Sequence, residues 1–117
     1  IIVAEDDDDT CLFLTVTLKG PGAQLKRATN GKILMEMLKD RMADLILLDI
    51  NMPLMTGYEC IAEIWNKQYP VKVIAQTAYA MTEERNRCMA VGCDDYLAKP
   101  LSKTGLFTSL KNILPTL

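Results

Sequence analysis

Two apolar runs of this chain end in carboxylates. Residues 45–48 (LILL) are followed by Asp49, and residues 1–4 (IIVA) are followed by five consecutive acids, from Glu5 to Asp9. Short apolar runs bounded by polar turns are typical of buried strands in a parallel sheet, whose ligands lie beyond the carboxyl ends of the strands. Crowded carboxylates repel one another, and a divalent cation with oxygen ligands relieves this repulsion. The pattern therefore predicts a Mg²⁺ site beside a reactive aspartate.

The rest of the chain supplies the elements that must position these acids. Strand-like and helix-like segments alternate five times, which predicts an α/β fold: one parallel sheet with helices on both faces, joined by right-handed crossovers. The expected strands are residues 1–4, 23–28, 44–48, 71–75 and 96–98. The expected helices begin at Asp8 or Asp9, which can cap the first of them, and then at about residues 32, 58, 82 and 102.

Breaks and apolar faces define the ends and the packing of these helices. Residues 20–22 (GPG) end the first helix, and Gly92 ends the fourth in a left-handed conformation. Ile61, Ile64 and Trp65 share one face of the third helix, so Trp65 is expected to pack against the sheet with one edge exposed. The last helix is expected to bury four residues, namely Leu106, Leu110, Ile113 and Leu114.

Four of the five expected strands end in residues suited to metal or phosphate chemistry. These are Glu5 with Asp6, then Asp49, Thr77 and Lys99. The second strand is the exception, and it lies at an edge in the strand order 2-1-3-4-5 of doubly wound sheets. In that order the other four strands are neighbours, so we expect their polar ends to converge.

Composition limits the alternatives. The chain has 117 residues, enough for one domain with a core, and its net charge is −2. Basic residues are scattered, so no nucleic-acid surface is expected, and no apolar stretch reaches the roughly 20 residues of a membrane span. The four cysteines form no Cys-x-x-Cys pair, so we expect reduced thiols and a cytoplasmic location. The chain begins inside an expected strand, so we expect residues 1–117 to be a single domain of a longer protein.

Four motifs stand in order along the chain, at residues 3–7 (VAEDD), 47–57 (LLDINMPLMTG), 76–78 (QTA) and 92–100 (GCDDYLAKP). Together they resemble the receiver domain of two-component response regulators, over essentially the whole length. The resemblance implies a flavodoxin-like (βα)5 fold and a phosphorelay switch that carries a phosphoryl group on an aspartate. It also implies that the domain promotes its own aspartyl phosphorylation and dephosphorylation without being an enzyme in the usual sense.

The resemblance implies a role for each acid at the predicted metal site. Asp49 is similar to the aspartate that accepts the phosphoryl group. Asp6 is similar to a direct Mg²⁺ ligand, and Glu5 to an acid that holds a metal-bound water. The backbone carbonyl of Asn51 would complete the ligands that the protein supplies.

The resemblance also implies which residues contact the phosphoryl group. Thr77 is similar to a hydroxyl residue that hydrogen-bonds the phosphoryl oxygens, and Lys99 to the cation that pairs with them. Tyr96 resembles a switch aromatic that changes rotamer as Thr77 is drawn inward. Pro100 matches a proline whose preceding peptide bond is cis. The neutralising cations fit the chemistry, because phosphoryl transfer depends mainly on positioning and charge.

Partners follow from the resemblance and from one absence. The chain has no histidine, so a phosphohistidine donor must lie on a histidine kinase or histidine phosphotransfer domain, in another protein or elsewhere in the parent. The output is expected through the face of the fourth helix, fifth strand and fifth helix, toward an output domain or a downstream protein. A hybrid histidine kinase is favoured as the parent over a DNA-binding regulator. Dimerisation through the fourth and fifth helices is left open.

Three other interpretations are weaker. A phosphatase of the haloacid-dehalogenase type also uses an aspartate and Mg²⁺, but it needs a second aspartate two residues later, where this chain has Asn51. A flavodoxin-like FMN protein needs a phosphate-binding loop after the first strand, and five acids there would repel the phosphate. A degenerate receiver used only for contacts is disfavoured by the intact set of polar strand ends.

Overall fold

The computed structural model describes residues 1–19, 24–52, 54–77 and 82–113. Several predicted features lie outside the described residues: the break at residues 20–22, the start of the second strand at Ala23, the motif residues Pro53 and Ala78, and Leu114 in the last helix.

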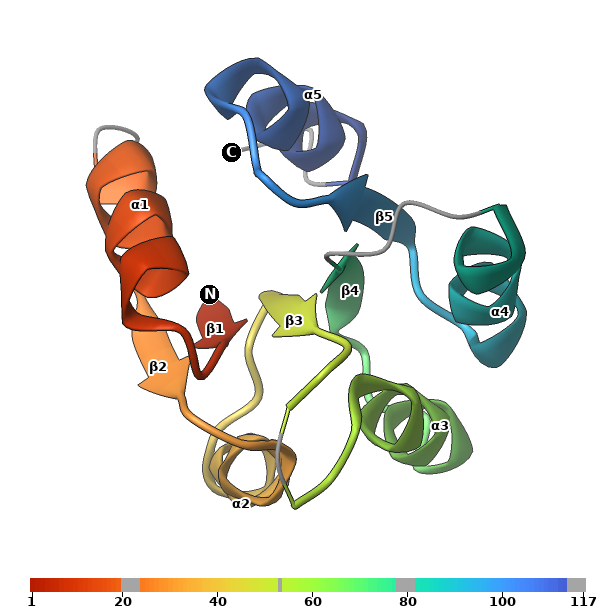
Figure 1. Cartoon of the computed structure of the whole chain (residues 1–117). Coiled ribbons are helices and arrows are strands. Elements are labelled where there is room, and N and C mark those ends of the chain that lie inside the picture. The colour runs from red at the N-terminus through yellow and green to blue at the C-terminus, as the bar shows by residue number, and fades with distance from the viewer. Residues whose placement is uncertain (20–23, 53, 78–81, 114–117) are drawn as a thin grey trace.

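Five parallel strands form one sheet in the order β2-β1-β3-β4-β5, as predicted. The strands are β1 (Ile2–Ala4), β2 (Lys26–Ala28), β3 (Leu45–Asp49), β4 (Lys72–Thr77) and β5 (Asp95–Ala98). The helices are α1 (Asp8–Lys19), α2 (Gly31–Asp40), α3 (Gly57–Asn66), α4 (Thr82–Val91) and α5 (Lys103–Ile113). Helices α1 and α5 cover one face of the sheet, and α2, α3 and α4 cover the other (Figure 1). Among the described residues, no helix combines the length and apolar character that crossing a membrane requires.

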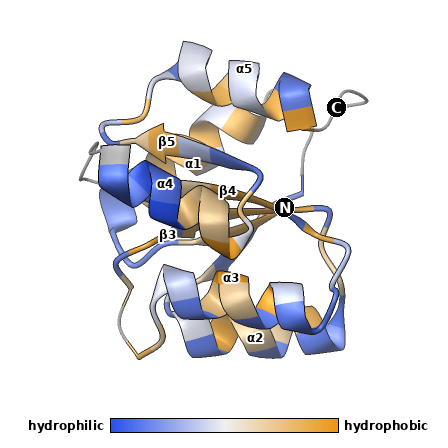
Figure 2. Ribbon diagram, turned by 90° about the vertical axis from the view of Figure 1, so that its right-hand side faces the viewer, coloured by the Kyte–Doolittle hydropathy of each residue, from blue (hydrophilic) through white to orange (hydrophobic). Residues whose placement is uncertain are grey.

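The two faces of the sheet pack into two apolar clusters. Side chains alternate between the faces along each strand. In β3, Leu47 belongs to the cluster that packs against α1 and α5, and Leu48 belongs to the cluster that packs against α2, α3 and α4. Figure 2 shows the apolar strands between helices whose polar sides face outward. The alternation therefore decides toward which helices each strand-end residue points.

The start of α1 differs from the prediction that Asp8 or Asp9 caps it. The cap is Asp7, whose Oδ2 accepts hydrogen bonds from the backbone N–H of Thr10 at 2.9 Å and from its hydroxyl at 2.6 Å. Because the helix begins at Asp8, the residue placed to accept a bond from its first turn is the one before. Asp8 instead pairs with Arg27 at 2.8 Å.

The loop after β3 is tightly held at the start of α3. Thr56 and Glu59 form a reciprocal capping box. Gly57 lies against the backbone that follows β3: a Cβ at this position would be 2.6 Å from Cα of Ile50. The helix start thus fixes the path of the chain directly beyond Asp49.

Trp65 does not pack against the sheet, so that prediction is wrong. Its side chain is 69% exposed, whereas Ile61 and Ile64 of the same helix are buried. The indole lies beside Gly92, which ends α4 with a φ of +113°, as the sequence predicts. Trp65 is at the border of the apolar stripe of α3, so the apolar pattern of this helix did not determine whether its side chain is buried.

Candidate functional site

The strand register sets three polar residues in one row at the carboxyl edge of the sheet. Ala4 of β1 pairs with Leu48 of β3, so the next residues, Glu5 and Asp49, lie opposite each other. Asp49 in turn pairs with Gln76 of β4. Residues from three separate parts of the sequence therefore meet where the strands end.

The alternation of side chains directs this row toward the α1/α5 face. Each residue of the row lies two positions after a buried member of the apolar cluster on that face, and Lys99 lies two positions after Leu97, which packs against that cluster. The four pairs are Val3 and Glu5, Leu47 and Asp49, Ile74 and Gln76, and Leu97 and Lys99. The polar row is thus the continuation of an apolar layer.

Lys99 joins the acids across the row. Its Nζ lies 3.1 Å from both carboxylate oxygens of Glu5 and 3.3 Å from Oδ2 of Asp49. Its backbone N–H donates to the carbonyl of Thr77 at 2.7 Å, and the peptide bond between Lys99 and Pro100 is cis. The ammonium group is a cation within hydrogen-bond reach of two buried carboxylates.

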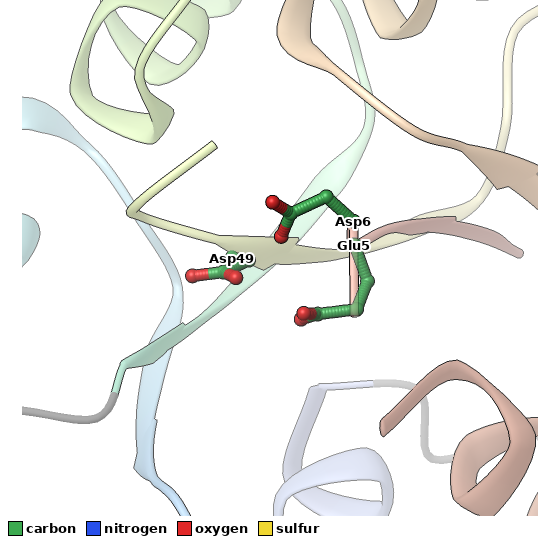
Figure 3. Close-up of side chains that lie close together, drawn as sticks. All are labelled: Glu5, Asp6 and Asp49. Carbon is green, nitrogen blue, oxygen red and sulfur yellow. The ribbon is translucent and has the colours of Figure 1, made fainter. Parts of the chain in front are cut away.

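The carboxylates of Glu5, Asp6 and Asp49 form a group suited to a hard cation. One oxygen from each lies within 4.8 Å of the others. Figure 3 shows Glu5 and Asp6 leaving the end of β1 in opposite directions, with Asp49 beside them at the neighbouring end of β3. Glu5 and Asp49 are buried and Asp6 is exposed, so the group is open to solvent on one side. The backbone N–H of Asn51 donates to Oδ1 of Asp49 at 2.9 Å, which orients this carboxylate.

Glu5 is the most perturbed acid of the group. Its pKa is raised to about 7, first by burial and then by the nearby charge of Asp49, against the opposing effect of the hydrogen bond from Lys99. Burial alone would lower the pKa of Lys99, but the hydrogen bond to Glu5 and the charge of Asp49 outweigh it, so the pKa of Lys99 is raised. The Glu5 oxygens also accept from the backbone N–H of Asp7 and from Nε2 of Gln76, each at 3.1 Å.

Thr77 and Tyr96 lie toward the other face of the sheet. Thr77 is fully buried and lies two positions after Ala75, so it shares a face with this member of the cluster beneath α2, α3 and α4. Its hydroxyl donates to Oε1 of Glu84, in the first turn of α4, at 2.5 Å. Tyr96 packs against the same cluster, and burial raises its pKa. These two residues are therefore connected to α4, while Glu5, Asp6, Asp49 and Lys99 form the acid–lysine group.

Sequence reasoning missed Gln76 and Glu84. Gln76 gave a signal, because it is a polar residue at the end of an otherwise apolar strand, directly before Thr77. Glu84 gave none beyond its favourable place at the start of a helix, since its bond to Thr77 depends on how α4 packs.

Comparisons with known proteins agree with this geometry. Residues 1–111 match the sequence model of the family described as the response regulator receiver domain. The transcriptional regulatory protein ZraR of Escherichia coli O157:H7 is 32% identical over 114 residues, which cover 97% of this chain and 26% of that protein. This chain therefore spans about a quarter of the length of that relative.

Two solved structures have the same fold. One is the receiver domain of the sensor histidine kinase PA1611 from Pseudomonas aeruginosa PAO1, with a magnesium ion in its active site cleft. It is 26% identical, with a TM-score of 0.88 over 98% of this chain and 96% of that chain. The other is the co-crystal structure of the Saccharomyces cerevisiae histidine phosphotransfer protein Ypd1 with the receiver domain of Ssk1. It is 25% identical, with a TM-score of 0.88 over 96% of this chain and 86% of that chain. With its family match, strand order and polar strand ends, this chain belongs to the response regulator receiver domain family of two-component signalling.

Proposed function

We propose that the chain is a phosphoacceptor switch in which Asp49 accepts a phosphoryl group from a phosphohistidine. An oxygen of Asp49 attacks phosphorus, the phosphorus–nitrogen bond breaks, and the imidazole leaves with the electron pair. The observation that carries the proposal is the pairing of a nearly buried carboxylate, 5% exposed, with the ammonium of Lys99 at 3.3 Å beside two further acids. This arrangement joins a nucleophile to a cation that can neutralise the incoming group.

The acid group fits Mg²⁺. Hard divalent cations prefer carboxylate and carbonyl oxygens, and three carboxylate oxygens within 4.8 Å of one another can share one ion. We propose that Glu5, Asp6 and Asp49 hold it with the backbone carbonyl of Asn51, Glu5 acting through a bound water. When bound, the ion would neutralise charge on the phosphoryl oxygens. The magnesium ion in the PA1611 receiver domain supports this proposal.

Lys99 and Thr77 would contact the phosphoryl group after transfer. The group adds about two negative charges, so it competes with Glu5 for the ammonium of Lys99. It would also offer acceptor oxygens to the hydroxyl of Thr77, which now donates to Glu84 of α4. A change of partner by Thr77 would alter how α4 is held, with Tyr96 moving beside it. In this way the face of α4, β5 and α5 would report phosphorylation as a shift between two conformations.

The partner would be a histidine kinase or a histidine phosphotransfer domain. The complex of Ypd1 with the Ssk1 receiver domain supports a partner of this kind. Two kinds of longer protein are candidates for the parent of this domain. ZraR represents the first, a transcriptional regulator, and PA1611 represents the second, a sensor histidine kinase. We favour the kinase, and the sequence that flanks the domain in the parent gene is the test. The match to the receiver family gives no support to the phosphatase and FMN interpretations.

The test is labelling with acetyl phosphate and Mg²⁺, followed by intact-protein mass measurement before and after acid treatment. The wild-type chain should gain one acid-labile phosphoryl group, and Asp49→Asn should gain none. Asp44→Asn is the matched control, because Asp44 is an exposed aspartate at the other end of β3. Full labelling of Asp49→Asn would refute the proposal, and steady turnover of a phosphomonoester would favour a phosphatase.

A further inference from the structure

We infer that Gln76 is a positioning residue whose amide holds the carboxylate of Glu5, so that Lys99 can leave Glu5 and pair with a phosphoryl group on Asp49. The inference rests on the proposed function, because it concerns the lysine that the proposed transfer uses.

Gln76 is placed for this contact by the sheet. The residue is 1% exposed, and its side chain points toward the α1/α5 face, as Ile74 does two positions earlier. Burying an amide is unfavourable unless it is hydrogen-bonded. Nε2 of Gln76 donates to Oε2 of Glu5 at 3.1 Å, which offsets this cost. The polar side chain of Gln76 is therefore explained by its hydrogen bond to the carboxylate of Glu5 rather than by packing in the apolar layer.

The donors around Glu5 are divided between its two oxygens. Oε1 accepts from the backbone N–H of Asp7, and Oε2 accepts from Gln76. Lys99 donates to both oxygens, each at 3.1 Å. If the ammonium moves away, each oxygen of this fully buried carboxylate still keeps one donor.

Lys99 has to serve two groups in the proposed function. Its Nζ already lies 3.3 Å from Oδ2 of Asp49 while it is bonded to Glu5. A phosphoryl group on Asp49 would attract the ammonium strongly, because hydrogen bonds between charged groups are the strong ones. Without Gln76, that move would leave Oε2 of Glu5 without a protein donor, which is costly for a buried charge. Glu5 would then retain Lys99, and the phosphoryl group would be less well neutralised.

The first test is the rate of labelling by acetyl phosphate with Mg²⁺, measured for Gln76→Leu in the wild-type and Lys99→Met backgrounds. Loss of one hydrogen bond to a charged group should slow labelling about tenfold in the wild-type background. Because Gln76 acts through Lys99, the same substitution should cost less than about twofold when Lys99 is absent. Gln24→Leu is the matched control, and its labelling should not change. Gln24 is exposed and lies just before β2, where its backbone carbonyl accepts a hydrogen bond from the amino group of Ile1.

Two results would overturn the inference: a normal labelling rate for Gln76→Leu, or a penalty that is equally large in both backgrounds. Gln76→Met, which keeps an unbranched side chain, replaces Gln76→Leu if the leucine variant does not fold. If the wild type itself takes no label, the proposed function is refuted, and so is the inferred role of Gln76. Labelled wild type beside an unaffected Gln76 variant refutes this inference alone.

A second measurement tests the contact without phosphorylation or metal. Urea midpoints are compared for the wild type, Gln76→Leu, Glu5→Gln and the double variant, in EDTA. The shift caused by Gln76→Leu should become smaller when residue 5 is glutamine, because the charge that the amide serves is gone. Additive shifts would show that Gln76 does not hold Glu5, and the inference would be wrong.

Discussion

Glu5 should make the domain less stable at high pH when no divalent cation is bound, and Glu5→Gln should remove this dependence. The side chain is fully buried, and burial, reinforced by the charge of Asp49, raises its pKa from 4.5 to about 7. Between these two values the folded chain binds a proton that the unfolded chain has released. The stabilising contribution of Glu5 is therefore complete below about pH 4.5 and is lost as the pH rises through about 7.

The size of the effect follows from the two pKa values. The interval from 4.5 to about 7, at 1.36 kcal/mol for each pH unit, corresponds to about 3 kcal/mol. The hydrogen bond from Lys99 is already included, since it opposes the rise in the pKa of Glu5. Relative to Glu5→Gln, the wild type should lose roughly this free energy of unfolding between about pH 4.5 and pH 8. Mg²⁺ should stabilise the wild type more at about pH 8 than at about pH 5.5, because protons compete with it for Glu5.

The assay is urea unfolding in EDTA at several pH values across this interval, followed by the fluorescence of Trp65, the single tryptophan of the chain. Glu36→Gln is the control, because Glu36 is an exposed glutamate on α2, and its stability curve should run parallel to that of the wild type. Parallel curves for the wild type and Glu5→Gln would refute the reasoning, since they would mean that Glu5 titrates alike in the folded and unfolded chain.

Three further predictions concern the same edge of the sheet. Gly57→Ala should destabilise the domain by about 1–3 kcal/mol or more, because the added Cβ would lie 2.6 Å from Cα of Ile50 and the backbone cannot move aside at low cost. Thermal unfolding measures this loss, and an unchanged midpoint would contradict the prediction. Thr56→Ala should cost about 1 kcal/mol by removing the capping box of α3, whereas Thr56→Ser should retain most of it, as urea titration can show. Asp6→Asn should weaken Mg²⁺ binding about tenfold or more in calorimetry, because one charge near a divalent ion contributes about 2 kcal/mol even in water; an unchanged affinity would place the ion elsewhere.

The meeting of Glu5, Asp49 and Lys99 could be predicted from the sequence. Apolar runs show where the strands end, and parallel strands bring their carboxyl ends to one edge. The motifs of the receiver family gave the same residues independently. Helix starts were less predictable: Asp7, Asp8 and Asp9 are chemically equivalent as caps, and only the path of the chain after β1 selected Asp7. The prediction that Trp65 packs against the sheet was wrong, because a residue at the border of an apolar helical stripe is buried or exposed according to its neighbours.

By itself, the sequence determined the alternation of strands and helices and the polar residues that end four of the five strands, because both follow from local patterns. Only the tertiary structure decided which side chains form hydrogen bonds with one another. Gln76 and Thr77 are adjacent, yet they point to opposite faces, one to Glu5 and the other to Glu84 of α4. Gln76 and Glu5 are 71 positions apart, and the contact exists because the sheet register brings β1 and β4 to the two sides of β3. Register and face depend on the packing of the whole sheet against both helical layers, which no local stretch of sequence contains.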